Sequence, residues 1–198
     1  MDPTLERFCA GSNITAAELS HRLDPKRPIG REEQLSRFGT ALYALYWQAE
    51  RARKLGISWR NFCVGCSMYA FREDAYNYED RWRVFYGMNT KIAEGARNIC
   101  AEPVPLGAAY ASAYSEIIGM VIVGEPQADE NGHNYLTLRP CSHCRLLMKN
   151  HPLIRPETII VTAHPPIGEV ESLDEVVHEA FTFQELLVAY GETNPAGP

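Results

Sequence analysis

Three cysteines and one glutamate of this chain have the residue types and the spacing of a catalytic metal centre. Cys100 stands two residues before Glu102, and a Pro-Cys-Ser-His-Cys segment follows at 140–144. Zinc in structural sites usually has four protein ligands, whereas catalytic zinc keeps three and leaves one position open. Three thiols beside a carboxylate therefore predict a reaction centre in which Zn²⁺ is held by Cys100, Cys141 and Cys144.

A second cysteine pair, Cys63 and Cys66, offers a closed four-cysteine site as the alternative. Residues 61–71 have the apolar content of a buried strand, on which these two side chains would point to opposite faces. Cys141 and Cys144 would instead share one face in the first turn of a helix, where the helix dipole favours thiolates. We therefore favour the open site and interpret Cys63 and Cys66 as reduced cysteines in or near the core.

Glu102 is close enough to one ligand to serve a water molecule that the metal activates, without itself binding the metal. As a base it would take a proton from that water, and as an acid it could return the proton to the reacting compound. The alternative is an ordinary glutamate that complements the dipole at a helix N-terminus. Its place between the ligand segments favours the catalytic interpretation.

The elements that must position these residues alternate between helix and strand. Apolar residues at three- and four-residue steps predict a helix over 31–55, with Gly56 as its C-cap. The pattern then predicts a hairpin of strands at 61–71 and 81–87, a helix from about 100 to 117, a strand at 118–123, a helix at 140–150 and a strand at 158–162. This order favours an α/β sandwich with part of the sheet parallel.

The N-terminal region reads as an appendage to one domain. A capping box predicts a short helix within 12–23, and a Pro-rich segment at 24–30 then interrupts the chain. We therefore divide the sequence into an N-terminal extension, 1–30, and a single domain, 31–198. A length of 198 residues with 45% hydrophobic residues suits one well-packed domain.

Composition also limits the class of partner and the compartment. The net charge of −6 argues against broad binding to nucleic acid, so a small-molecule substrate is favoured. No apolar stretch approaches the ~18 residues of a membrane span, and the N-terminus lacks the pattern of a secretory signal. We expect a cytoplasmic protein with reduced thiols and no membrane association.

The motif residues resemble the zinc-dependent cytidine deaminase superfamily, whose signature combines Cys or His, Ala and Glu with a later Pro-Cys-x-x-Cys. The resemblance runs from about 34 to 190, and the segment 100–107 with its alanine-rich continuation is especially similar to the blasticidin S deaminase branch. It implies a three-layer α-β-α sandwich around a mixed five-stranded sheet, a bound Zn²⁺ and a homotetramer.

Substrate contacts follow from the same resemblance. Phe62 and Val64 match positions that line the base pocket, Asn89 matches an asparagine that hydrogen-bonds the sugar, and Ala101 lies between ligand and acid. A glutamate is expected two residues after the asparagine, but this chain has Lys91 there. A lysine cannot accept hydrogen bonds from sugar hydroxyls, although it can donate to a phosphate or carboxylate. The alternative is that Lys91 simply faces solvent.

Charge at the metal raises a further expectation. Three thiolates on Zn²⁺ form an anionic cluster that needs nearby positive charge to lower the pKa of water. Family members often carry an arginine after the catalytic glutamate, where this chain has Pro103. Arg145, next to the last ligand, is our candidate for compensation, with Arg97 or a plain surface role for Arg145 as alternatives. His143 lies between two ligands but is not expected to bind the metal.

Together these features predict a hydrolytic deaminase that converts the cytosine ring of a free nucleoside, or of a modified or acidic one, to uracil with release of ammonia. One alternative is a deaminase of polynucleotide cytosine, which would need a basic and aromatic channel. The other is a catalytically silent zinc scaffold of the same fold. The acidic composition counts against the first alternative, and the intact Glu102 counts against the second.

Overall fold

A computed structural model describes residues 28–192, apart from 76, 95–97 and 129–130. The predicted helix within 12–23 and the alternative compensating residue Arg97 lie outside the described residues. The division of the chain at residue 30 stays a prediction, although the first described helix begins directly after it.

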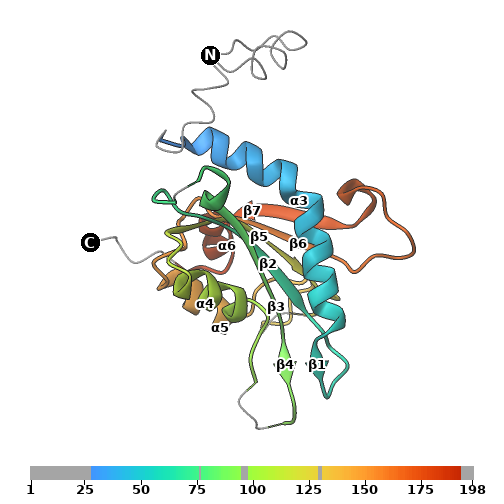
Figure 1. Ribbon diagram of the computed structural model, residues 1–198. Coiled ribbons are helices and arrows are strands. Elements are labelled where there is room, and N and C mark those ends of the chain that lie inside the picture. The colour runs from blue at the N-terminus through green and yellow to red at the C-terminus, as the bar shows by residue number, and fades with distance from the viewer. Residues whose placement is uncertain (1–27, 76, 95–97, 129–130, 193–198) are drawn as a thin grey trace, which may run out of the picture.

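Five strands form one mixed sheet in the order β3-β2-β5-β6-β7 (Figure 1). Their bounds are Gly65–Phe71 for β2, Trp82–Met88 for β3, Glu116–Val123 for β5, Ile159–Ala163 for β6 and His178–Thr182 for β7. Strands β5 and β6 are parallel, whereas every other neighbouring pair is antiparallel. The predicted mixed five-stranded sheet is confirmed.

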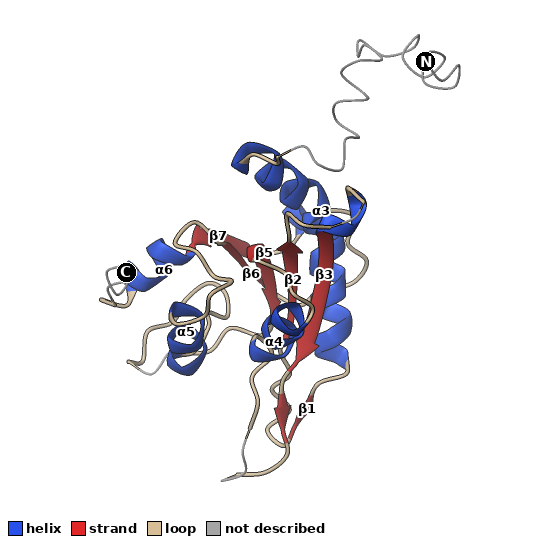
Figure 2. Ribbon diagram, turned by 60° about the vertical axis from the view of Figure 1, so that its left-hand side comes forward, coloured by secondary structure: helices blue, strands red, loops and turns tan. Residues whose placement is uncertain are grey.

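Helices cover both faces of this sheet (Figure 2). Helix α3 (Arg31–Lys54) packs on one face, and α4 (Pro103–Ala111), α5 (Ser142–Lys149) and α6 (Phe183–Ala189) lie on the other. Each face has its own apolar core, because strands covered on both sides bury alternate residues in opposite directions. The predicted three-layer α-β-α sandwich is therefore confirmed.

Smaller elements lie at the margins of the sandwich. Strands β1 (Ile57–Ser58) and β4 (Thr90–Lys91) pair in parallel outside the main sheet, and two short 3-10 helices span Glu79–Arg81 and Leu173–Glu175. The short β1–β4 ribbon brings Lys91 into the region of the predicted site. Within the described residues, no helix is long and apolar enough to cross a membrane.

The predicted strand at 61–71 is wrong in its first four residues. Asn61 adopts a left-handed backbone with φ 55°, and the hydroxyl of Ser58 accepts a hydrogen bond from the Phe62 amide. Asparagine tolerates this conformation better than most residues, so it ends one segment and β2 begins only at Gly65. Cys63 therefore precedes the strand that contains Cys66.

Two other predictions need correction at their boundaries. The helix expected over 100–117 spans only Pro103–Ala111, and Ala113, with φ 59°, ends the turn that follows it. Strand β5 then begins at Glu116, two residues before the predicted start. Two proline residues near the start of α4 and a positive φ after its end define this short helix.

Glycine permits a close approach that positions the catalytic segment. A Cβ atom on Gly87, near the end of β3, would lie 2.6 Å from the Cβ atom of Val104 and 2.7 Å from Cδ of Pro105. The absence of a side chain lets the first turn of α4 lie against the strand. Glu102, the N-cap of α4, is thereby held beside the sheet.

Candidate metal centre and substrate cavities

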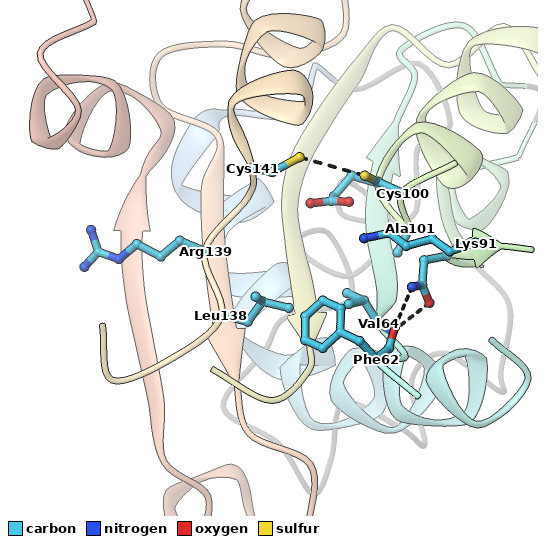
Figure 3. A pocket seen from close by; sticks show the side chains of 10 residues that line it. Phe62, Val64, Lys91, Cys100, Ala101, Leu138, Arg139 and Cys141 are labelled. Carbon is cyan, nitrogen blue, oxygen red and sulfur yellow. Dashed lines mark hydrogen bonds between the residues drawn. The ribbon is translucent and has the colours of Figure 1, made fainter. Parts of the chain in front are cut away.

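The three predicted ligand cysteines converge in space from two segments far apart in the sequence. Cys100 precedes α4, Cys141 is the N-cap of α5, and Cys144 lies in the first turn of α5. Their three Sγ atoms all lie within 4.8 Å of one another, and Cys100 Sγ is 3.8 Å from Cys141 Sγ (Figure 3). The segments 100–102 and 141–144 thus form one cluster.

The spacing of these sulfur atoms fits a zinc ion. With Zn–S bonds of about 2.3 Å, two ligands of a tetrahedral ion stand about 3.8 Å apart. Cys100 and Cys141 already have this separation. Soft thiolates are also the ligands that select zinc over hard cations.

Cys63, Cys66 and His143 do not belong to this cluster. Cys63 donates its thiol to the carbonyl of Gly56 at 3.5 Å, and Cys66 is buried in the apolar core. Neither belongs to the group that could hold a metal, and exposed His143 does not belong to it either. The alternative closed site is absent among the described residues, but for a different reason than predicted, because Cys63 is not on a strand at all.

The three thiols affect one another strongly. Contacts with the thiols of Cys100 and Cys144 hold the pKa of Cys141 far below its usual range, while the contact with Cys141 raises the pKa of Cys100. The cluster thus loses its first proton easily and its later protons with difficulty, because each new negative charge repels the others. A dication would remove that obstacle by replacing the remaining protons.

Glu102 is buried beside this cluster. Only 5% of the residue is exposed, and burial raises the pKa of its carboxyl group above the usual value. The positive charge of Lys91 opposes this rise in the pKa of Glu102 but does not cancel it. A carboxyl group with a raised pKa is suited to take a proton and give it back near neutral pH.

A small cavity of about 60 Å³ opens beside the cluster (Figure 3). It is lined by Phe62, Val64, Asn89, Lys91, Cys100, Ala101, Glu102, Leu138, Arg139 and Cys141. Every residue expected to contact substrate therefore lies on this inner cavity, together with the acid and two of the ligands. The substrate roles themselves stay predictions.

Asn89 contributes to the cavity mainly by bracing its wall. The fully buried side chain accepts a hydrogen bond from the Val64 amide through Oδ1 and donates from Nδ2 to the Phe62 carbonyl, each at 2.8 Å. These two bonds replace strand pairing in the irregular segment before β2. Asn89 thereby fixes the backbone of the two residues predicted to line the base pocket.

A second, larger cavity of about 210 Å³ adjoins the first. The two share wall residues that include Phe62, Lys91 and Leu138. Residues that line only the outer cavity are Gln127, Ala128, Tyr135, Pro140 and Tyr190. The combined space is narrow beside the cysteines and wider, with more polar walls, away from them.

Lys91 lies at the junction of the two cavities. Its Nζ atom is 5.4 Å from the centre of the Phe62 ring, over the ring face, and its side chain extends into the cavity in Figure 3. Lys91 is partly buried and lines both cavities, and whether it contacts a substrate or faces solvent stays a prediction. A cation over an aromatic face is held in place by the quadrupole of the ring.

Arg139 lines both cavities and was missed from the sequence. Its guanidinium lies 4.1 Å from the Tyr135 ring centre and binds the Glu179 carboxylate at 3.0 Å. In Figure 3 the side chain points away from the cysteines. Its position just before Cys141 was a usable signal, because the residues that lead into a ligand motif commonly form the wall of the site.

Arg145 is buried, so its alternative role as a plain surface residue is wrong. Only 2% of it is exposed, and its guanidinium binds the carboxylate of Glu192 and the carbonyl of Pro140, each at 2.9 Å. Its guanidinium carbon also lies 3.5 Å from the centre of the Tyr190 ring. The suggested compensation of the metal charge by Arg145 stays a prediction.

The fold and the cluster together define an α/β protein with three cysteines at the N-termini of two helices that could hold a metal ion. A solved structure of cytidine deaminase from Burkholderia pseudomallei is similar to this chain, with 23% identity over 72% of this chain and 93% of that one and a TM-score of 0.51. The chain therefore has the fold of cytidine deaminases.

A second solved structure matches with a lower TM-score. Cytidine deaminase from Mycobacterium leprae matches 73% of this chain and 94% of its own at 26% identity, with a TM-score of 0.46. No protein-family model matches the chain, and no curated protein matches it.

Proposed function

We propose that this protein is a zinc-dependent hydrolytic deaminase that converts the cytosine ring of a free nucleoside or nucleoside derivative to uracil. The observation that carries the proposal is the convergence of three elements on one cavity. A three-thiol cluster with zinc-like spacing, a buried carboxyl group with a raised pKa and an apolar slot all meet there. The deaminase fold agrees with this chemistry.

The residues of the chain have distinct roles in the proposed reaction. Cys100, Cys141 and Cys144 would hold the zinc ion, which supplies a water molecule of lowered pKa when it is bound. The ring would lie against Phe62 and Val64, with C4 towards the cluster. The small side chain of Ala101 leaves space beside it.

Glu102 moves the protons. It takes one proton from the water as oxygen bonds to C4, and passes this proton to the ring nitrogen N3. It then transfers the second proton of the same water to the amino group, which leaves C4 as ammonia. Water and a cytosine compound thus become a uracil compound and ammonia, without any redox step.

A free small molecule suits the site better than a polynucleotide. The inner cavity is small, and the chain carries a net charge of −6. Strands of nucleic acid need an extended groove with cations and stacked aromatic residues. We further propose that the protein works in the cytoplasm, in keeping with the free thiols of the five cysteines that the structure describes.

An acidic cytosine derivative is the finer candidate, and Lys91 supports it. Its ammonium group lies on both cavities, and no described carboxylate forms an ion pair with it. A phosphate or carboxylate attached to the sugar would find this cation beyond the base. A Lys91→Glu variant should then shift the preference from acidic towards neutral nucleosides, and an unchanged ratio of rates would contradict the contact.

The proposed activity is tested by a deamination screen. Cytidine, deoxycytidine, their monophosphates, acidic cytosine nucleosides and single-stranded DNA are incubated with wild type, Glu102→Gln and Glu94→Gln, and ammonia is measured. Glu94 is an exposed carboxylate that pairs with Arg60, and it serves as the control. We expect ammonia from wild type and Glu94→Gln, and loss of about 10²–10⁴-fold in Glu102→Gln.

The other outcomes of the screen separate the alternatives. Activity confined to DNA would replace the small-molecule proposal. No ammonia from a zinc-loaded wild type would instead favour a silent scaffold.

We also propose a homotetramer. Exposed apolar side chains lie on α4 and α5, among them Val104, Tyr110, Leu146 and Leu147. Such side chains commonly mark an interface between subunits. Light scattering coupled to size exclusion should give a mass near four chains, and a monomer mass would contradict the proposal.

A further inference from the structure

Arg145 joins two segments that are far apart in the sequence. It lies in α5 directly after the ligand Cys144, and its Nη1 atom donates to the carbonyl of Pro140, directly before the ligand Cys141. Nε and Nη2 both bind Oε1 of Glu192, after α6, at 2.9 Å. The residue therefore ties the segment after α6 to the ligand segment 140–144.

The segment after α6 forms part of the outer cavity. Tyr190 lines this cavity, lies under the guanidinium of Arg145, and has its ring centre 5.9 Å from that of Tyr135. Tyr135 also lines the cavity and supports Arg139. The position of one wall of the outer cavity thus depends on how the segment after α6, 190–192, is held.

We propose that the outer cavity is the subsite for the part of the substrate beyond the base, and that the Arg145–Glu192 pair holds Tyr190 in place as its wall. The ligand class is the sugar of a cytosine nucleoside with any polar substituent that it carries. The amide of Gln127 and the ammonium group of Lys91 offer donors for hydroxyl or acidic groups, and the rings of Tyr135 and Tyr190 form the wall beside them. Arg145 is then a positioning residue, which acts through Tyr190. This inference rests on the proposed function.

Burial and pairing favour this role over compensation of the metal charge. The guanidinium is almost fully buried and has a carboxylate directly against it, so its field beyond that partner is reduced. Removing Glu192 leaves the buried Arg145 cation without its carboxylate, and removing Arg145 leaves the part-exposed Glu192 without its cation. If the pair holds the wall, loss of either partner should therefore raise KM to a similar extent. If Arg145 compensates the metal charge, only loss of Arg145 should lower zinc affinity.

Two single variants and their combination distinguish the two roles. Arg145→Met removes the cation, Glu192→Gln removes the carboxylate but keeps the cation, and the double variant removes both. For each, KM, kcat and zinc affinity against a chromophoric chelator are measured. Arg31→Met, which breaks the Arg31–Glu116 pair of 2.7 Å at the start of α3, is the matched control.

We expect both single variants to raise KM by about tenfold, with the double variant no worse than either, because coupled partners are not additive. Zinc affinity and kcat should stay within about threefold of wild type, and Arg31→Met should leave KM unchanged. Loss of zinc and kcat in Arg145→Met alone would overturn the inference and assign the arginine to the metal. Unchanged KM in both singles, or additive effects, would also overturn it.

A readout without substrate separates this inference from the proposed activity. Hydrogen exchange of the amides of residues 183–192 should quicken in both Arg145→Met and Glu192→Gln, with little change in β5 and β6. If wild type deaminates nothing, the proposed function fails, yet the exchange still reports on the pair. Unchanged exchange in both variants would show that the pair does not hold this segment.

Discussion

The metal cluster and the substrate cavities of this protein are built in different ways. The cluster comes from two short segments, 100–102 and 141–144, each at the N-terminus of a helix. Within each segment the functional residues are only two or three positions apart. The cavity walls come from at least five segments, including the loop before β2, the β1–β4 ribbon and the residues after α6. A local motif can specify the chemistry, whereas the substrate depends on long-range packing.

Loss of a cluster thiol should give the largest effect. Cys141→Ala leaves two protein ligands, so zinc affinity and deamination should both fall below detection, because each thiolate supplies both charge and geometry. Bound zinc is measured by elemental analysis beside ammonia release. Cys63→Ala is the control, since the Cys63 thiol lies outside the cluster and donates to the Gly56 carbonyl. Retention of one zinc per chain in Cys141→Ala would disprove the ligand assignment.

The same contrast decides what could be predicted from the sequence. The grouping of Cys100, Glu102, Cys141 and Cys144 could be predicted because their spacing suggests the chemistry directly, and the alternating helices and strands predicted the α/β sandwich. The 3.6-residue period of α3 and the apolar run of β5 were strong enough to predict both elements. Their boundaries were less accurate where the backbone adopts positive φ, as at Asn61 and Ala113.

Other features had no local signal or a signal that was overlooked. Strand β7 has no fully buried residue and no clear apolar alternation, so it escaped prediction. Helix α6 was not predicted, although Thr182 and Glu185 form a capping box that could be read from the sequence. Glu179, the partner of Arg139, and Glu192, the partner of Arg145, are more than thirty residues away in the chain, where no spacing rule applies.

Asn89 offers a way to sharpen the comparison, because it belongs to the cavity wall rather than to the cluster. Asn89→Ala leaves the buried Val64 amide and Phe62 carbonyl without their partners, so the free energy of unfolding should fall by about 1–3 kcal/mol. Urea denaturation measures the change. Asn98→Ala, which loses only an exposed 3.4 Å contact, should be near neutral.

Zinc content should separate wall from cluster in this variant. Asn89→Ala should still bind zinc, while its KM rises because Phe62 and Val64 lose their bracing. Loss of zinc together with stability would mean that wall and cluster form one cooperative unit, and the distinction between the two regions would fail.

The smallest expected effect concerns Glu179, the partner of Arg139 in the cavity wall. It is a dependence of the free energy of unfolding on pH. Burial alone would raise the pKa of Glu179, but hydrogen bonds from Thr137 and Arg139 outweigh it and lower the pKa below its usual value. A lowered folded-state pKa means that the contribution of Glu179 to stability is complete above the unfolded pKa of about 4.3 and is lost as pH falls further.

Because this pair is partly exposed, its contribution should be under about 1 kcal/mol. Denaturation curves at pH 7 and at about pH 3, below the unfolded pKa, should show wild type losing more stability on acidification than Glu179→Gln, which has no charge to lose. Glu185→Gln is the control. Hydrogen bonds from Thr182 in the capping box of α6 also lower the pKa of Glu185, but this residue lines neither cavity. Equal pH dependence of wild type and Glu179→Gln would show that the Arg139 wall is held by its stacking on Tyr135 and Phe181 rather than by charge.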